Sequence, residues 1–204
     1  MMRLIAILRQ SSQMNRLLIL PVLLLTLLAG TPVSSADFQK GKDAYDSGDF
    51  PTAVRALAEQ GDASAQFELG FLYKNGRHGV PQNSKTAVKW CKLAAEQGYA
   101  PAQYQLGAMH EVAQDYKTAV KWYRLTAEQG VARAQFQLGL MYDRGNGVIK
   151  DNVFAHMWFN IAASNGNEFG GKLRDSLAER MTSSQLEKAQ DLARECVRKK
   201  YKGC

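Results

Sequence analysis

Apolar and small residues recur along the chain with the spacing of amphipathic helices. In the segment AQFELGFLY they lie about one helical turn apart, at Ala65, Leu69, Leu72 and Tyr73. The same pattern returns in AQYQLGAMH (102–110) and AQFQLGLMY (134–142). Side chains spaced by three or four residues fall on one face of a helix. We therefore predict a helix with one buried face at each of these three places.

A second pattern predicts another helix after each of these. It consists of Ala, a Trp three residues later and a pair of small residues four residues after the Trp, and it begins at Ala87, Ala119 and Ala155. The Trp positions are Trp90, Trp122 and Trp158, and the copies end at Gly98, Gly130 and Gly166. A glycine just past a helix takes the left-handed conformation that ends it. Since no segment has the alternating pattern of a strand, the chain is predicted to be all-α.

The two patterns together form an internal repeat. The segments AVKWCKLAAEQGYAPAQYQLG (87–107) and AVKWYRLTAEQGVARAQFQLG (119–139) share 15 of 21 residues at an offset of 32. Such self-similarity is typical of stacked helical repeats. Repeats are predicted at 63–99, 100–131 and 132–167, with a shortened cap repeat before them (37–62) and capping helices with a basic tail after them (168–204).

A glycine lies inside the first helix of each repeat, at Gly70, Gly107 and Gly139. Glycine within a helix costs about 1 kcal/mol relative to alanine. We expect close contact between the two helices of a repeat as compensation, with the Trp of the second helix filling the space beside the small residues. No strand pattern precedes these glycines, which argues against a dinucleotide-binding loop.

These motifs resemble the Sel-one-like repeat, a longer-looped relative of the tetratricopeptide repeat. The resemblance rests on A-Q-F-x-L-G-x-x-Y, a G-x-G-V loop and A-x-x-W-x-x-x-A-A-x-x-G, and it extends from about Phe38 to Gly166. It implies a right-handed α-solenoid of antiparallel helix pairs that holds other proteins. The repeat at 100–131 lacks the G-x-G-V loop and is closer to a plain tetratricopeptide unit, which implies a local change in superhelical spacing.

The first 36 residues have the features of a secretory signal peptide. They are basic, they contain the apolar run LLILPVLLLTLLA (17–29), and small residues lead up to Ala36. We expect cleavage after Ala36 and a mature protein in the periplasm or outside the cell. The alternative is an uncleaved membrane anchor, for which the apolar run is short.

Charge is concentrated at the C-terminus. The formal net charge of +7 falls to +4 when Arg3, Arg9 and Arg16 leave with the signal peptide, and residues 170–204 alone contain nine Lys or Arg and five Asp or Glu. A nucleic-acid-binding protein would show a continuous basic stripe, so no nucleic-acid partner is expected. The tail helices are expected to cover the last repeat. The alternative is contact with anionic lipid or cell wall through Arg198, Lys199, Lys200 and Lys202.

Catalytic and metal-binding motifs fail on spacing. His110 and Glu111 could begin a zinc site of the H-E-x-x-H type, but position 114 is Gln. His78 and His156 occupy unrelated repeat positions, and the usual nucleophilic-serine signatures are missing. We therefore expect a protein that is not an enzyme and that uses no cofactor or metal.

Two of the three cysteines are predicted to form a disulfide bond. Cys196 and Cys204 lie eight residues apart in a protein expected to be exported, where disulfides persist. A continuous helix would hold them too far apart, but Gly203 could let the chain turn back. The alternative is a pair of free thiols. Cys91 stands where the other repeats have an aromatic residue, so it is expected to be buried.

The function that these features favour is binding of another protein or peptide in the periplasm or cell envelope. Some exported, cysteine-rich relatives in the resembling family are linked to penicillin binding and weak β-lactamase activity. The repeats of this chain lack the cysteine pairs of those relatives. A purely structural spacer is the remaining alternative.

Contact with a partner is expected on the first helix of each repeat, at positions that vary while their neighbours stay fixed. The expected contact residues are Phe71, Lys74, Glu111, Leu140 and Asp143. The alternative for Phe71 and Leu140 is packing between neighbouring repeats.

Overall fold

The computed structural model describes residues 35–204, so most of the predicted signal peptide lies outside the described residues. Within this range the chain forms helices α2 to α11 and no strand. This confirms the predicted all-α class. The chain divides into two compact units, and the division falls between Gly61 and Asp62.

The described part of the first unit is a pair of helices, α2 (Ser35–Asp46) and α3 (Phe50–Glu59). The two helices pack against each other. Gly41 of α2 lies so close to α3 that a Cβ on it would be 3.2 Å from Cβ of Ala56. The predicted cleavage point after Ala36 falls in the first turn of α2.

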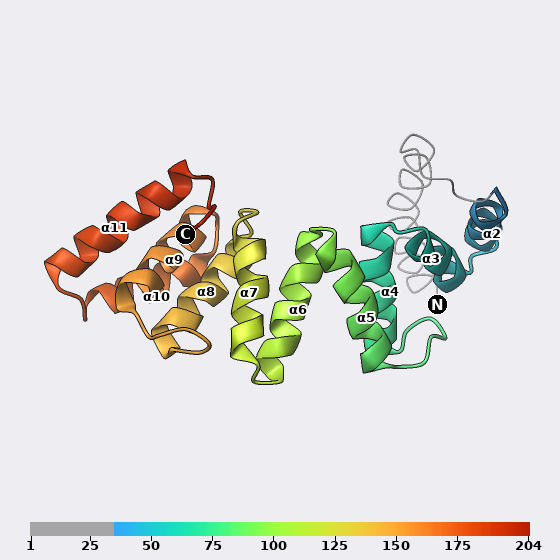
Figure 1. Cartoon of the computed structure of the whole chain (residues 1–204), viewed down its shortest axis with the longest axis horizontal. Helices are drawn as coiled ribbons and strands as arrows, with labels where there is room; N and C mark the ends of the chain where they lie inside the picture. The colour runs from blue at the N-terminus through green and yellow to red at the C-terminus, as the bar shows by residue number, and fades with distance from the viewer. Residues whose placement is uncertain (1–34) are drawn as a thin grey trace, which may run out of the picture. The chain divides into compact units, whose positions relative to one another are not determined.

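The second unit is a series of helix pairs. Its helices are α4 (Ala63–Asn75), α5 (Ser84–Glu96), α6 (Ala100–Val112), α7 (Tyr116–Ala127), α8 (Ala132–Arg144), α9 (Asn152–Ser164), α10 (Glu168–Ala178) and α11 (Ser183–Arg198). Each helix from α4 to α9 packs against the next one. Figure 1 shows α4–α5, α6–α7 and α8–α9 as successive antiparallel hairpins. This is the architecture of an α-solenoid with two helices in each repeat.

The turn inside a repeat differs between the middle repeat and its neighbours. Gly76 ends α4 and Gly145 ends α8, both in the left-handed conformation, and a loop follows each of them. In the middle repeat the short turn between α6 and α7 contains Gln114 at a φ of 60°. The second helices all begin with a side-chain cap, provided by Asn83, Asp115 and Asp151. The second helix therefore begins in the same way after either kind of turn.

The glycines inside α4, α6 and α8 allow close contact between the two helices of a repeat. Each of them faces the residue directly after the Trp, in the pairs Gly70 with Cys91, Gly107 with Tyr123, and Gly139 with Phe159. A Cβ on Gly107 would lie 2.6 Å from the Tyr123 ring. The expected close contact is present, but the prediction that the Trp fills this space was wrong. One residue turns a side chain by about 100° around a helix, so adjacent positions meet different neighbours.

The tryptophans differ in burial because their neighbours differ. Trp158 is fully buried in a core cluster that includes residues of α11. Trp122 is partly buried against a cluster of α5 and α6 residues, and Trp90 is also only partly buried. Complete burial of a Trp therefore depends on the C-terminal helix.

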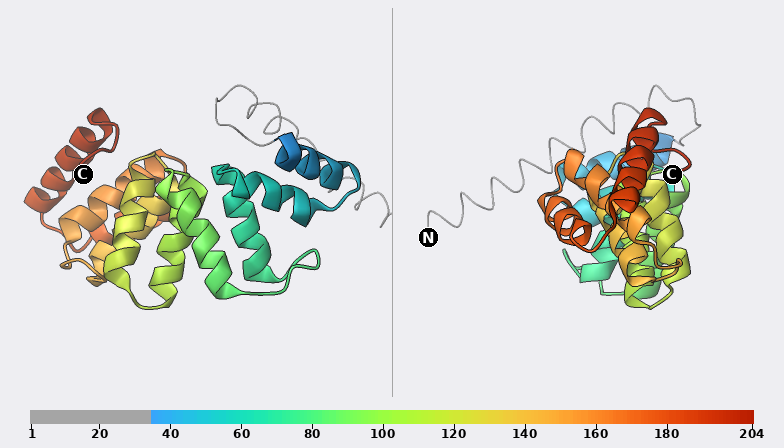
Figure 2. Two further views of the ribbon diagram at one scale, coloured as in Figure 1. Left: turned by 45° about the vertical axis from the view of Figure 1, so that its right-hand side comes forward. Right: turned by 90° about the vertical axis from the view of Figure 1, so that its left-hand side faces the viewer.

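The last two helices depart from the pattern of the repeats. α10 packs against α9 and α8, as the first helix of a further repeat would, whereas α11 packs along α9. A capping box, formed by Thr182 and Gln185, begins α11. Figure 2 shows α11 crossing the C-terminal end of the second unit. α11 thereby shields the apolar side of α9 from water.

Candidate functional site

A row of buried glutamines connects the repeats. Gln66, Gln103 and Gln135 occupy the same position in α4, α6 and α8, and each is at most 5% exposed. Gln103 Nε2 donates a hydrogen bond to Ala95 O over 3.1 Å, and Gln135 Nε2 donates to Ala127 O over 3.2 Å. Both acceptors lie in the preceding repeat, near the end of a helix where carbonyl groups lack helical partners. Each of these carbonyls also accepts from a backbone N–H, that of Gly98 or Gly130, so the glutamines add a second donor and join adjacent repeats.

Each of these glutamines also accepts a hydrogen bond from the end of its own repeat. The donors are Gln97, Gln129 and Asn165, and all three bonds are 2.8 Å long. We refer to the six side chains together as the glutamine ladder. Its signal in the sequence is the recurrence of glutamine in A-Q and in E-Q-G, but a polar side chain is ordinarily expected at the surface. Sequence reasoning therefore missed the ladder.

Phe71 of α4 is an exposed aromatic side chain, with 38% of its surface accessible. The Arg77 guanidinium carbon lies 5.6 Å from the centroid of its ring, as in a cation–π contact. Lys74, also on α4, is half-buried. Burial raises the pKa of the nearby Cys91 thiol, and the positive charge of Lys74 opposes part of this effect. This part of α4 therefore presents an aromatic ring with cations near it.

Glu111 of α6 is held by contacts within the protein. Its Oε2 accepts a hydrogen bond from Tyr123 Oη over 2.6 Å and one from Gln137 Nε2 over 3.4 Å. Burial, together with the bond to this carboxylate, raises the pKa of the Tyr123 phenol. The phenol therefore remains protonated and continues to donate. Glu111 links α6, α7 and α8 as well as lying at an expected contact position.

Leu140 and Asp143 of α8 contact other parts of the protein. Leu140 is partly buried against a cluster formed by residues of α9 and α10. Asp143 Oδ1 lies 4.0 Å from a guanidinium nitrogen of Arg180. Packing within the protein is therefore the interpretation that fits Leu140. The expected contact residues lie on the three first helices α4, α6 and α8, with Phe71 and Lys74 the two on α4, and their contact with a partner stays a prediction.

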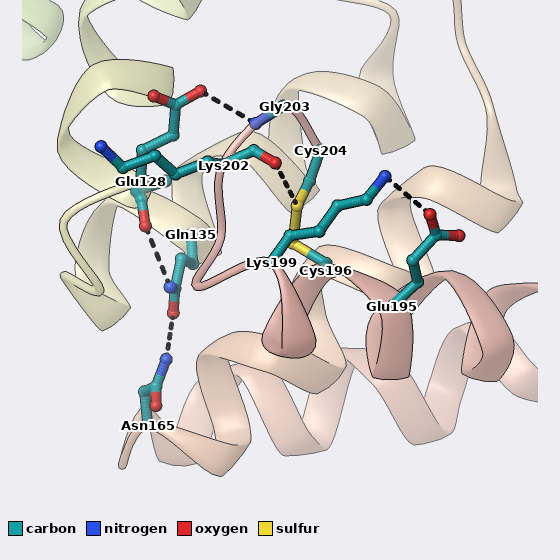
Figure 3. The surroundings of a disulfide bond; sticks show 10 residues. Glu128, Gln135, Asn165, Glu195, Cys196, Lys199, Lys202, Gly203 and Cys204 are labelled. Atoms are coloured by element: carbon teal, nitrogen blue, oxygen red, sulfur yellow. Dashed lines mark hydrogen bonds and ion pairs between the residues drawn. A yellow bond between two sulfur atoms is a disulfide. The ribbon is translucent and has the colours of Figure 1, made fainter.

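A disulfide bond closes the C-terminus into a short hook. Cys196 and Cys204 are bonded, with their Cα atoms 5.6 Å apart, and Figure 3 shows the surrounding contacts. The chain turns back through residues with positive φ, namely Lys200, Tyr201 and Gly203. Tyr201 Oη donates to Asn165 Oδ1 over 3.1 Å, and the Gly203 N–H donates to Glu128 Oε1 over 3.5 Å. The hook therefore contacts residues just past the ends of α7 and α9.

The basic residues of the tail are exposed, namely Arg198, Lys199, Lys200 and Lys202. The ammonium group of Lys199 pairs with Glu195 over 2.6 Å. In residues 35–204 no helix is long and apolar enough to cross a membrane. Contact of these four residues with lipid or cell wall stays a prediction.

The candidate catalytic and metal-binding side chains are spread over different helices and loops of the described chain. Across residues 35–204, no group of three or more His, Cys, Asp or Glu side chains is placed to hold a metal ion. Cys91 is 2% exposed, and burial raises its thiol pKa, which makes it a poor nucleophile. His110 Nδ1 lies 3.2 Å from Asp115 Oδ2, in the turn of the middle repeat.

The fold and the repeated contacts define an α-solenoid of two-helix repeats, and the sequence motifs identify its kind. The Sel1 repeat family matches residues 63–99, 100–131 and 132–167. The chain therefore belongs to the Sel1 repeat family, which confirms the resemblance seen in the sequence. Proteins with Sel1 repeats are generally scaffolds for protein–protein interaction.

Two solved structures and one curated protein are similar to parts of this chain. A Sel1 repeat protein from Oxalobacter formigenes is 39% identical with a TM-score of 0.56, and the match covers 60% of this chain and 95% of that chain. A protective antigen of uropathogenic Escherichia coli with an SLR fold is 31% identical with a TM-score of 0.49, over 83% of this chain and 46% of that chain. An F-box protein of Arabidopsis thaliana is 48% identical over 52 residues, which are 26% of this chain and 14% of that protein. The chain thus matches a small part of the length of the plant protein.

Proposed function

We propose that this protein is an exported, non-catalytic repeat scaffold that binds another protein or peptide in the bacterial periplasm or cell envelope. The glutamine ladder and the glycine contacts hold the helix pairs in fixed register. The first helices of the pairs then present side chains that differ from one repeat to the next. Such a surface recognises a partner through several side chains held at fixed distances.

The exposed ring of Phe71 is the observation that carries this proposal. Aromatic residues and arginine are enriched in the parts of interfaces that contribute most to binding energy. Phe71 has Arg77 beside its ring, and Lys74 lies on the same helix. A cation beside an apolar ring favours a partner that carries a carboxylate near an apolar side chain.

Export is supported by features at both ends of the chain. Residues 1–36 have the composition of a signal peptide. The bond between Cys196 and Cys204 supports an oxidising compartment, because disulfides are rare in the reducing cytosol.

Penicillin binding or weak β-lactamase activity would be detected with nitrocefin. Sustained hydrolysis above a heat-treated control would overturn the non-catalytic part of the proposal.

Chemical crosslinking in cells that export a tagged form of the protein tests the binding function. Affinity capture and mass spectrometry should identify a discrete partner. The Phe71→Ser variant should recover about tenfold less of it, because the loss of one interface anchor commonly costs that much or more. The thermal midpoint of the variant should stay within a few degrees of the wild type.

Val88→Ser on α5 is the matched control for this experiment. Val88 is 37% exposed, close to the 38% of Phe71, but it lies on the second helix of the repeat. Capture by this variant should equal capture by the wild type. Equal losses in both variants would mean that the surface of α4 is not the binding surface.

A further inference from the structure

A cleft of about 1000 Å³ lies between α10 and α11, with α9 as its floor. It is lined by apolar, polar and charged side chains from all three helices. The cleft is lined by the last three helices. Phe71 belongs to α4, and Figure 1 shows α4 at the other end of the series of helix pairs. The cleft is therefore separate from the surface to which the proposed function refers.

The cleft occupies the place where a second helix would pack in a complete repeat. In α4, α6 and α8 the seventh and eighth residues after the N-cap are Leu69-Gly70, Leu106-Gly107 and Leu138-Gly139. The glycine of each pair faces the second helix. In α10, counted from the N-cap Asn167, these two positions are Arg174 and Asp175, and both line the cleft. α10 thus lacks the apolar seat for a helix, and α11 packs along α9 instead.

One charge in the lining of the cleft has no ion-pair partner. Arg174 pairs with Asp175, and Arg194 pairs with Asp191. Glu195 is paired with Lys199. Among the described residues Arg198 makes no ion pair, although it lines the cleft. A bound anionic group would neutralise this guanidinium, which binds carboxylates through paired hydrogen bonds.

His156 adds unused hydrogen-bonding capacity at the floor of the cleft. The side chain is 4% exposed, and its Nδ1 has no hydrogen-bond partner in the described part of the chain. Burial lowers the pKa of the imidazole, and the positive charge of Arg174 lowers it further against the opposing charge of Asp175. A neutral imidazole has one donor and one acceptor nitrogen. Buried polar atoms without a partner are uncommon and call for an explanation.

We propose that this cleft binds a short, extended peptide segment that carries one carboxylate next to an aliphatic side chain. Arg198 takes the carboxylate, and His156 hydrogen-bonds to a peptide group. The aliphatic side chain packs against Leu186 and Val197, which line the cleft on the α11 side. This site would exist whether or not a partner binds at Phe71.

The chemistry of the lining favours an extended peptide over a polyanion or a helix. Arg174 and Asp175 together offer donors and acceptors, as a peptide backbone requires. A nucleotide or another polyanion would be repelled by the carboxylates that line the cleft, those of Asp175, Asp191 and Glu195. A helix would need the close approach that glycine permits in the complete repeats, and the side chain of Asp175 prevents it.

An NMR titration of the purified protein with three tripeptides tests this proposal. The probes are acetyl-Leu-Asp-Val-amide, acetyl-Leu-Asn-Val with a free C-terminal carboxylate, and acetyl-Leu-Asn-Val-amide. At about 1 mM, a peptide with a carboxylate should shift the amide signals of α9, α10 and α11, and the uncharged peptide should bind at least about tenfold more weakly. The first two probes distinguish an acidic side chain from a chain terminus as the source of the carboxylate. Pyrophosphate, the fourth probe, should bind more weakly than either of them.

Two variants and one control locate the binding. Arg198→Gln should weaken the carboxylate peptides about tenfold, because it removes the unpaired cation from an exposed position. Arg174→Leu combined with Asp175→Gly restores the Leu-Gly pair of the other repeats and should also abolish the shifts. Lys172→Gln, an exposed change on α10 outside the cleft, should bind like the wild type.

Several results would overturn the proposal. They are an absence of shifts in α9 to α11 with every peptide, tighter binding of pyrophosphate than of the peptides, and unchanged binding by Arg198→Gln. The last result decides the question even if the double variant does not fold. Loss of partner capture by Phe71→Ser would not bear on it, so the two proposals fail independently.

Discussion

The α8–α9 pair and the α10–α11 pair each begin with a helix that packs on the preceding repeat, but their second helices pack differently. In the first pair Leu138 and Gly139 receive α9, and the Phe159 ring lies against the glycine. In the second pair Arg174 and Asp175 hold the same positions, and α11 packs along α9. Two residues at the centre of a first helix therefore distinguish a helix that accepts a partner helix from one that leaves an open cleft.

The comparison separates two roles of the repeat motif. Glycine at the eighth position after the N-cap determines how closely the second helix approaches, whereas the buried glutamines determine how one repeat sits on the next. α10 keeps the contact with the preceding repeat, because Gly170 would meet Phe159 O at 2.9 Å if it carried a Cβ. α10 lacks the glycine at the eighth position that would allow a following helix to pack closely against it. The array thus ends without a further buried pair.

The largest effect is expected from filling the glycine space of the regular pair. In Gly139→Ala the new Cβ would overlap the buried Phe159 ring. Overpacking of this kind costs about 1–3 kcal/mol, which exceeds the roughly 1 kcal/mol that alanine gains in helix propensity. Chemical denaturation should therefore show a loss of up to about 2 kcal/mol. The control is Gly171→Ala, whose Cβ would lie 3.8 Å from Ala163 Cβ and should be neutral or stabilising. A stable Gly139→Ala protein would contradict the packing role.

A somewhat smaller effect is expected from breaking the link between repeats. Gln135→Leu removes the side-chain hydrogen bond to Ala127 O, which still accepts from the Gly130 N–H over 2.9 Å, and the bond from the exposed Asn165 amide. Each lost hydrogen bond costs about 0.5–1.5 kcal/mol, part of which the added apolar burial offsets. The urea midpoint should fall, and hydrogen exchange should accelerate at the junction of α7 and α8. Unchanged exchange at this junction would show that the glutamine ladder does not join the repeats.

A local effect is expected from opening the hook at the irregular end. The disulfide bond closes a short loop at the end of the chain and restricts the open forms of the hook. Cys204→Ser should speed amide exchange in residues 199–204 and expose Tyr201, while exchange in α4 to α8 stays the same. Reduction of the wild-type protein should reproduce this change. Slower or unchanged amide exchange in the hook would show that the disulfide bond does not hold the hook in place.

The smallest effect is a dependence of stability on pH that arises from His156. Its pKa is lowered from the ordinary value of 6.5 in the folded protein. The unfolded chain therefore binds more protons below that pH, and stability falls as the pH drops through the lowered folded pKa. The decrease between pH 7 and pH 5 should be smaller in His156→Gln than in the wild type. Identical pH profiles would show that the imidazole is not held in its neutral form.

The repeat architecture could be predicted from the sequence because it depends on local patterns. Helical spacing, capping residues and the recurring glycines each act within a few residues of the chain, and three copies reinforce one another. The same holds for the capping box at Thr182 and for the approach of Cys204 to Cys196. These features need no knowledge of the rotation of one helix against another.

The rest could not be predicted because it depends on that rotation and on distant contacts. Trp90 and Cys91 are neighbours in sequence, and only the orientation of α5 decides which of them faces Gly70. The glutamine ladder joins residues about 30 positions apart. From sequence alone, these polar side chains would be expected at the surface. Arg174 and Asp175 are found to replace the Leu-Gly pair only when α10 is aligned with the other first helices by its N-cap.

Hydrogen exchange of the protein with and without its captured partner tests the central claim most directly. If the first helices of the regular repeats form the binding surface, protection should appear in α4 around Phe71 and extend towards α6. The outward sides of α5 and α7 should exchange as in the free protein. Protection confined to α5 and α7, or none at all despite saturating partner, would contradict the assignment of this surface and with it the proposed mode of binding.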